Sequence, residues 1–356
     1  MTTAKPPASK PPRVPRERTR PEPKSIDLAL QGGGSHGAFT WGVLDRLLED
    51  EDLRIEGVSG TSAGAMNAAV MVHGHTLGGP QRARQALETF WWQVSLGGLA
   101  SPFQRGLLDH LMGRWTMDNS LSFMAYEMGS RLFSPYTSNP FDFNPLEAGL
   151  REHIDYEAIA RSPIKLFVTA TNVHTGQGRV FRNAEITPEV LMASACLPQM
   201  FQAVEIDGVP YWDGGYAGNP TMTPLVRECE SSDTILVQIN PVERKETPMS
   251  PNAIMNRLNE VSFNATLLKE LRMMALLRQV APDRSRNPEA ARWAQMRIHR
   301  IASDAMNDLG YSSKLNSEWP FLIRLRDAGR EAAEAFLQAH REDLGVCSSL
   351  DLDALL

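Results

Sequence analysis

The sequence predicts a three-layer α/β/α fold with a mostly parallel central sheet, followed by a mainly helical C-terminal extension. Short apolar runs alternate with segments of helical periodicity from Ser25 onward. Strands that alternate with helices in this way build parallel sheets covered on both faces. Beyond Pro241 the sequence becomes largely helical, which predicts the extension.

The composition is that of a globular protein with a sizeable core. The chain has 356 residues, of which 42% are apolar and 22% charged, enough for one large domain or two ordinary ones. A net charge of −6 argues against a nucleic-acid-binding protein. Cys196, Cys229 and Cys347 are widely spaced and form no disulfide or metal-binding pattern, which indicates a reducing compartment.

The first 24 residues differ from the rest of the chain. They are rich in Pro, Lys and Arg, and they lack the apolar segment of a secretory signal. We expect a disordered tail over 1–24 and, since no apolar run approaches the roughly 18 residues of a membrane span, a soluble cytoplasmic protein. The tail carries seven basic and two acidic residues. It is either an arm that contacts anionic lipid at the inner membrane surface or a solvated tail, which we favour as the commoner case.

The strands and helices of the predicted core follow in order. Buried strands are expected at 25–30, 53–60, 163–173, 180–183 and 233–241. Helices are expected at 36–50, where the apolar residues recur on one side, and at 63–74. In the extension we expect long amphipathic helices at 252–280 and 317–340, with a strand at 296–301 between them.

A helical insertion is predicted over about 85–160, where the alternation of strands and helices is interrupted. Its large apolar side chains either pack against the sheet or form the wall of an apolar substrate channel, and both interpretations can hold for different residues. These side chains are Trp91, Trp92, Trp115, Phe123, Met124, Tyr126, Met128, Phe133 and Tyr136.

A G-x-S-x-G motif spans Gly60 to Gly64 and places Ser62 between a predicted strand and a predicted helix. That context is the one a nucleophile elbow needs, because the glycines allow the tight turn that exposes the hydroxyl. The alternative is a Gly/Ser-rich turn without chemistry. With the strand and the helix both expected, we favour a nucleophile.

The glycine run from Gly32 to Gly37 also connects a strand to a helix, and two interpretations compete. As G-x-G-x-x-G it would bind a dinucleotide, but the acidic residues 49–51 precede the second strand instead of ending it. As an oxyanion hole it would aim backbone N–H groups at a developing negative charge. The best donors are then Gly33 and Gly34, with Gly32 and Ser35 as further contributors.

A serine nucleophile needs a base, and none of the eight histidines lies in an obvious catalytic motif. His36 lies within the glycine run. Asp213, followed by Gly214 and Gly215, is a carboxylate that could be presented at a strand end and accept the proton of Ser62 directly. The alternative for this run is a simple β-turn, since Asp-Gly is a common turn dipeptide.

Taken together, the glycine run, the elbow and the Asp213-Gly214-Gly215 run resemble, in this order, the patatin-like phospholipase family. The segment 194–215 (SACLPQMFQAVEIDGVPYWDGG) and the NPTMTPL run with Asn219 add to the resemblance, which covers roughly 27–226. It implies a patatin-like catalytic domain over 27–226, followed by the last core strand and a mainly helical extension over 227–356. The extension resembles that of one bacterial branch of the family.

The resemblance also implies a mechanism. Ser62 would be the nucleophile and Asp213 the base of a Ser–Asp dyad that needs no histidine, metal or cofactor, and the substrates would be acyl esters of lipids, including phospholipids and lysophospholipids. One departure is His36, where the family commonly carries Arg or Lys. Alternatives are a Ser-His-Asp esterase using His299 or His340, a dinucleotide-binding oxidoreductase, and a lipid-binding protein without turnover. The oligomeric state is not predicted.

Overall fold

The computed structural model describes residues 22–99, 101, 103–130, 132–280 and 287–356. Its centre is one sheet built from β1 (Lys24–Leu30), β2 (Leu53–Gly60), β3 (Lys165–Asn172), β4 (Gly178–Arg182), β5 (Val204–Ile206), β6 (Val209–Asp213), β7 (Asp233–Val237) and β8 (Arg297–Ile301). The strand order is β5-β6-β3-β2-β1-β7-β8, with β4 paired to β3. Strands β3, β2, β1, β7 and β8 are parallel, whereas β4, β5 and β6 pair antiparallel.

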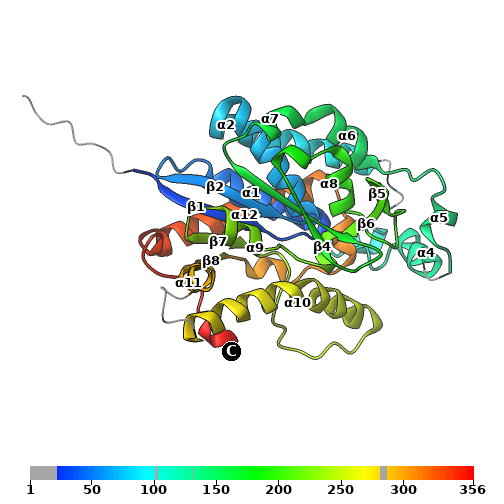
Figure 1. Ribbon diagram of the computed structural model, residues 1–356. Coiled ribbons are helices and arrows are strands. Elements are labelled where there is room, and N and C mark those ends of the chain that lie inside the picture. The colour runs from blue at the N-terminus through cyan, green and yellow to red at the C-terminus, as the bar shows by residue number, and fades with distance from the viewer. Residues whose placement is uncertain (1–21, 100, 102, 131, 281–286) are drawn as a thin grey trace, which may run out of the picture.

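Helices cover both faces of this sheet (Figure 1). One group packs around α1 and α2, and the other lies on the opposite side with α10. The helices are α1 (Gly37–Leu47), α2 (Ala63–Leu99), α3 (Leu107–Leu111), α4 (Leu121–Ser130), α5 (Pro135–Ser138), α6 (Pro145–His153), α7 (Tyr156–Ala160), α8 (Pro188–Ser194), α9 (Thr223–Glu228), α10 (Pro251–Val280), α11 (Pro288–Gln295) and α12 (Trp319–His340).

The strands supply side chains to two separate cores. In β1, Leu28 and Leu30 join the core under α1, α2 and α12, whereas Ala29 joins the core under α9, α10 and α11. The same division occurs in β7, where Ile235 and Leu236 point to opposite faces. Because side chains alternate along a strand, a strand buried on both faces is apolar at nearly every position. The three-layer α/β/α prediction is therefore confirmed.

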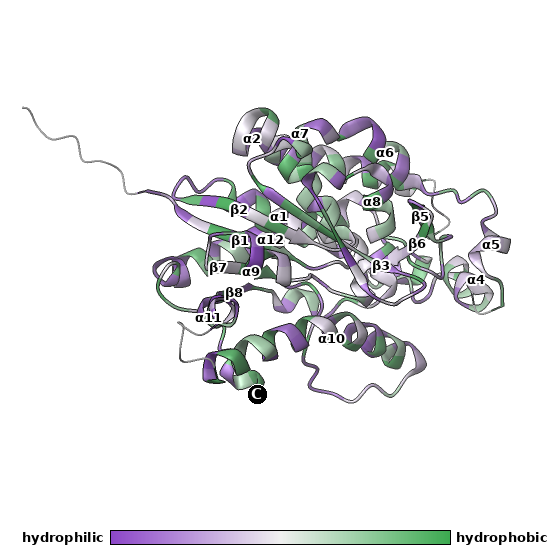
Figure 2. Ribbon diagram, viewed as in Figure 1, coloured by the Kyte–Doolittle hydropathy of each residue, from purple (hydrophilic) through white to green (hydrophobic). Residues whose placement is uncertain are grey.

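The covering helices have a different pattern from the strands. Figure 2 shows that hydrophobic and hydrophilic residues alternate along α6, α7 and α10.

The helices α1 and α12 cross at unusually close range. A Cβ on Gly42 would overlap the Arg326 carbonyl group, and a Cβ on Gly329 would overlap the Phe39 carbonyl oxygen. The two glycines let the backbones touch, so α12 of the extension packs beside α1 and also contacts β8. The extension also adds β8 to the sheet edge beside β7.

Most predicted elements are confirmed. A strand forms in every range expected, although β7 ends at Val237, four residues before the predicted end, and the extension contains the two long helices with β8 between them. The helix expected at 63–74 is longer, since α2 continues to Leu99 across a break in helical geometry at Gly78 and Gly79. This extra length occupies the start of the predicted insertion, whose described remainder consists of the short helices α3 to α7 and the loops between them.

The large apolar side chains of the insertion fall into a buried group and an exposed group. Trp91 and Phe123 are buried, and Trp115 stacks on Phe321 of α12. Five others remain at least two-fifths exposed: Trp92, Met124, Met128, Phe133 and Tyr136. Most of the predicted tail, residues 1–21, lies outside the described residues. None of the described helices is long and apolar enough to cross a membrane.

Candidate active site

Ser62 occupies a tight turn between β2 and α2. Its φ is 54°, a left-handed value that a serine rarely adopts, and its side chain is almost fully buried. The backbone N–H of Ser62 donates to Ser194 Oγ at 3.0 Å, and that hydroxyl donates to the Thr169 carbonyl oxygen at 2.7 Å. Such backbone strain, on the order of 1–3 kcal/mol, persists only where neighbours fix the conformation. Here α8 and β3 fix it.

Asp213 ends β6 and is fully buried. Its Oδ1 accepts the Gly215 N–H at 2.7 Å, and its backbone is held by Thr171 and Cys196. Among the described residues, Oδ2 has no hydrogen bond of ordinary geometry, although the Ser62 hydroxyl is close enough to influence the carboxyl group. Hydrogen bonds between catalytic groups are often long in a free enzyme.

The register of β3 explains how Ser62 and Asp213 come together. Gly60, the last residue of β2, pairs with Val168 of β3. Two residues further along, Ala170 pairs with Asp213. Because β4 occupies the other side of β3 at both positions, β2 and β6 follow one another along the same side. β6, which ends in Asp213, therefore begins to pair with β3 just beyond the point where β2, which leads into the elbow, has ended.

The electrostatic surroundings of Asp213 make its carboxyl group suited to accept a proton at neutral pH. Burial raises the pKa of Asp213 from 3.8 to about 6, against the opposing effects of the Gly215 N–H, the Ser62 hydroxyl and the positive charge of Lys314. The carboxyl group is therefore mostly ionised near pH 7 but binds a proton far more readily than an exposed aspartate does.

The glycine turn lies directly beside Ser62. A Cβ on Gly32 would come within 2.6 Å of Ser62 Cβ. The Gly32 N–H donates to Asn219 Oδ1 at 2.6 Å, and Asn240 Nδ2 donates to the Gly32 carbonyl oxygen at 2.9 Å. Gly34 has φ +59°, which glycine adopts without strain.

The N–H groups of this turn are not equally available. Within the part of the chain that the structure describes, those of Gly33, Gly34 and Ser35 donate no hydrogen bond, whereas that of Gly32 is engaged by Asn219. The turn leads into the 3-10 helix η1 (Gly34–His36) and then α1. Unpaired N–H groups at the start of a helix attract negative charge.

The other motif glycines lie at close backbone contacts around the same site. A Cβ on Gly60 would come within 2.5 Å of the Gly64 carbonyl oxygen inside the elbow. Gly37, Gly64, Gly214 and Gly215 would each meet a neighbouring residue at a similar or shorter distance. The predicted site residues of the three motifs are therefore brought together in space.

His36 turns to the extension. Its Nε2 lies 2.8 Å from Ser313 Oγ, and its ring packs edge-on near Phe321. Burial and the nearby charge of Lys314 hold the pKa of His36 well below its usual range, so the ring is neutral. His36 therefore adds no positive charge to the glycine turn.

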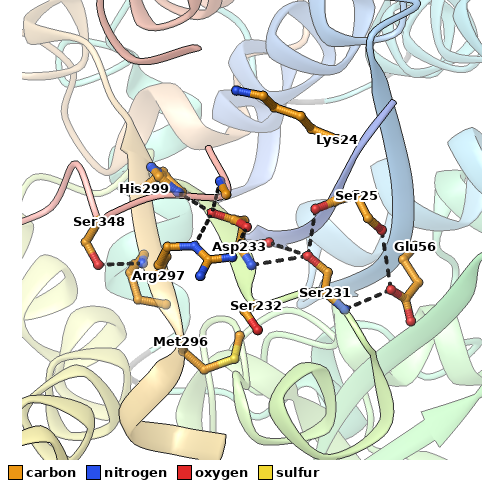
Figure 3. A network of polar contacts seen from close by, with 12 residues as sticks. Lys24, Ser25, Glu56, Ser231, Ser232, Asp233, Met296, Arg297, His299 and Ser348 are labelled. Atoms are coloured by element: carbon orange, nitrogen blue, oxygen red, sulfur yellow. Dashed lines mark hydrogen bonds and ion pairs between the residues drawn. The ribbon is translucent and has the colours of Figure 1, made fainter. Parts of the chain in front are cut away.

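His299 belongs to a polar cluster in another part of the sheet (Figure 3). Its Nε2 is 3.1 Å from Asp233 Oδ1, and Arg297 binds the same carboxylate. His299 lies on β8, three strands from β2, which corresponds to roughly 14 Å at the usual strand spacing. His340 pairs with Asp343 at the end of α12. Both histidines are engaged away from Ser62.

The acidic residues of the dinucleotide interpretation lie at the far end of α1 from the glycine turn. Glu49 pairs with Arg84 and Arg330, and Asp50 pairs with Arg341. In the described residues, no group of three or more His, Cys, Asp or Glu side chains is placed to bind a metal ion.

Three residues at the site were not identified from the sequence: Ser194, Asn240 and Lys314. Two of them carry a weak signal: Ser194 is the last residue of α8, and Asn240 follows the carboxyl end of β7, where parallel strands place functional residues. Lys314 lies in the extension, far along the chain, and no motif marks it.

Comparisons with known proteins identify the family of the chain. A family model described as Patatin-like phospholipase matches residues 28–226, more than half of the chain. A search of curated proteins finds no match. Among solved structures, the chain resembles VipD from Legionella pneumophila, with 15% sequence identity and a TM-score of 0.39 over 90% of this chain and 67% of that chain. The glycine turn, the elbow and Asp213 all fall within the matched residues. The chain therefore belongs to the patatin-like phospholipase family, whose members are lipid acyl hydrolases.

Proposed function

We propose that this lipid acyl hydrolase cleaves fatty-acyl esters of phospholipids or lysophospholipids through a Ser62–Asp213 dyad. The observation that carries the proposal is the meeting of a strained, elbow-mounted serine with a buried carboxylate whose Oδ2 lacks an ordinary hydrogen bond among the described residues. An unoccupied acceptor oxygen beside a serine hydroxyl is what direct proton transfer requires. Since the histidines considered for a triad are engaged elsewhere, no third residue is needed in the scheme.

The reaction then proceeds in two halves. Ser62 Oγ attacks the ester carbonyl carbon while Asp213 Oδ2 takes the hydroxyl proton. The carbonyl oxygen becomes an oxyanion held by the N–H groups of Gly33 and Gly34, with Ser35 as a further donor. Asp213 returns the proton to the departing alcohol, which leaves an acyl-enzyme on Ser62. Water, deprotonated by Asp213, attacks this ester and releases the fatty acid.

The aromatic and apolar surroundings support a lipid substrate. Tyr216, three residues after Asp213, is partly exposed and lies near Phe263, with 5.6 Å between ring centroids. In α4 and α10, several large apolar side chains are exposed: Leu121, Met124, Met128, Ile254, Met255, Leu258 and Val261. A fatty-acyl chain gains about 0.8 kcal/mol per buried methylene from such surfaces. We therefore propose that these residues receive the acyl chain.

The proposal is tested by labelling the purified protein with a fluorophosphonate probe and mapping the adduct by mass spectrometry. We expect one adduct on Ser62, lost in Ser62→Ala. Hydrolysis of a panel of phospholipids, lysophospholipids and neutral acylglycerols then identifies the head group and ester position. A protein that labels at Ser62 but releases fatty acid from none of these lipids would contradict the proposed substrate class and leave the nucleophile intact.

The basic tail supports a second proposal, peripheral contact with anionic membrane. Each basic residue near a charged bilayer contributes on the order of 1 kcal/mol, and the contact weakens with salt. Deleting residues 1–21 should then reduce sedimentation with phosphatidylserine vesicles at low salt. Equal sedimentation of the full and shortened chains would leave only the solvated tail.

A further inference from the structure

The C-terminal extension reaches the glycine turn through a short 3-10 helix, η5 (Ser312–Leu315). This helix lies outside the residues matched by the family model and packs against η1. Ser313 contacts His36, as described above, and the Lys314 carbonyl oxygen lies where a side chain on Gly34 would be. The extension is therefore in direct contact with the backbone that supplies the proposed oxyanion donors.

The Lys314 side chain is held by two asparagine side chains, one of which also binds the glycine turn. Its Nζ donates to Asn240 Oδ1 at 2.9 Å and to Asn259 Oδ1 at 2.6 Å. The ammonium group also lies 5.4 Å from the ring centroid of Phe263. Phe263 packs directly on Gly215, where a Cβ would overlap its ring. One aromatic ring thus separates the ammonium group from the loop that follows Asp213.

The charges around Lys314 come from three elements. Glu260 of α10 is paired with Arg244 and Arg257, and His36 of η1 is neutral. Asp213 of β6 forms no ion pair among the described residues, and Lys314 is the cation whose charge acts on it. Burial lowers the pKa of Lys314 to about 8, against the opposing charges of Glu260 and Asp213. Below that pH, Lys314 supplies positive charge to a site that otherwise holds a buried carboxylate.

We propose that Lys314 is a positioning residue of the active site: its ammonium charge keeps Asp213 in the ionised, proton-accepting form, and its hydrogen bond to Asn240 fixes the glycine turn. The second effect is transmitted by Asn240, whose Nδ2 binds the Gly32 carbonyl oxygen. The inference rests on the proposed Ser62–Asp213 mechanism. Under this proposal Lys314 is a functional part of the site, although it lies outside residues 28–226 that the family model matches.

The test uses the full chain and the pH dependence of kcat/KM on a soluble short-chain ester. Lys314→Gln removes the charge but keeps two N–H donors for the asparagine oxygens, and Lys314→Met removes both. Without the cation, protonation of Asp213 becomes easier, because a positive charge favours the carboxylate. The acid limb of the profile therefore moves to higher pH in both variants. For a displacement of about one pH unit, we expect kcat/KM to fall about fivefold near pH 6 and about tenfold near pH 5.

The loss should shrink as the pH rises. Near pH 9 the carboxylate is ionised in every variant and wild-type Lys314 has itself lost its proton, so Lys314→Gln should come within about twofold of wild type. Lys314→Met should keep an additional loss at every pH, because it also breaks the link to Asn240. Lys245→Met, a change at an exposed lysine, is the matched control and should follow the wild-type profile. Lys314→Arg, which keeps the charge, should retain the wild-type acid limb.

Two results would overturn the inference: acid limbs of Lys314→Gln and Lys314→Met that superimpose on wild type, or a loss of equal size at every pH. The second result would indicate a purely structural role. Ser62→Ala, measured in parallel, distinguishes a failure of the proposed dyad mechanism from a failure of the proposed role of Lys314. If Ser62→Ala keeps its activity, the proposed mechanism fails. If Ser62→Ala is inactive and the limb does not move, only the role of Lys314 fails.

Discussion

Gly32 donates its backbone N–H to the side-chain oxygen of Asn219 at 2.6 Å, although the two residues lie in distant parts of the sequence. The bond ties the turn after β1 to the loop after Asp213, and both residues are fully or almost fully buried. The next two N–H groups of the turn, those of Gly33 and Gly34, donate no hydrogen bond within the described residues. Asn219 therefore holds the turn of the proposed oxyanion hole against the loop that follows the proposed base.

We predict that Asn219→Ala weakens both the fold and the activity. The change leaves a buried N–H without an acceptor, which costs about 1–3 kcal/mol in the free energy of unfolding. Because the turn loses its anchor, kcat should fall more than KM rises. Urea denaturation and ester kinetics measure the two effects. Asn307→Ala, at an exposed asparagine, is the control, and equal behaviour of the two variants would argue against this role of Asn219.

Ser62→Ala should abolish ester hydrolysis without unfolding the protein. The hydroxyl is the proposed nucleophile, and its removal opens no large cavity. We expect kcat/KM to fall by at least about 10³-fold, with a circular dichroism spectrum like that of wild type. Ser134→Ala, at an exposed serine, should remain fully active. Full activity in folded Ser62→Ala would mean that the reaction takes place elsewhere.

Asp213→Asn should cost nearly as much activity as the loss of Ser62. The amide cannot accept the serine proton, and no second base stands behind it. In a triad, by contrast, a histidine would be as essential as the serine. We therefore expect His299→Gln, His340→Ala, His153→Ala and His174→Ala to stay within about threefold of wild type. One of these variants matching Asp213→Asn in kcat/KM, while still folded, would replace the dyad by a triad.

A further prediction concerns the stability of the sheet and its dependence on pH. Asp27 of β1 is fully buried, and burial, with the charge of Glu56, raises its pKa from 3.8 to about 8. Between these values the folded state keeps a proton that the unfolded state has lost, so stability falls as the pH rises from about 4 to about 8.

Asp27→Asn, which cannot ionise, should remove this decline. The variant should melt at a higher temperature than wild type at pH 8, and the difference should shrink toward pH 4. Asp308→Asn, at an exposed position, provides the comparison. A constant difference in Tm between Asp27→Asn and wild type across this range would mean that Asp27 keeps the same charge in both states.

The sequence was most informative where function depends on local backbone geometry. The elbow around Ser62 and the glycine turn are short, contiguous motifs whose glycines are needed for close backbone contacts, so they can be recognised without knowing what surrounds them. The alternating apolar runs likewise predicted strands such as β1 and β2 almost to the residue, because burial on both faces leaves few polar positions.

The contacts that complete the site could not be predicted in this way. Asn240 reaches Gly32 only because β7 pairs beside β1, and the pairing of strands is a property of the whole sheet. Lys314 reaches Asn240 and Asn259 from a 3-10 helix with no periodicity to reveal its orientation. The engagement of Gly32 by Asn219 could not be foreseen either, since a glycine motif does not tell which of its N–H groups is already bonded.

The glycine-to-glycine crossing of α1 and α12 means that a boundary drawn by sequence similarity is not a boundary for folding. A fragment ending at residue 226 would contain every residue of the proposed dyad and oxyanion hole. It would nevertheless lose β7, the sheet neighbour of β1, and leave the groove of α1 at Gly42 open to water. The catalytic motifs and the extension share one sheet and one helix crossing, so we expect that the extension cannot be exchanged or trimmed like an appended module.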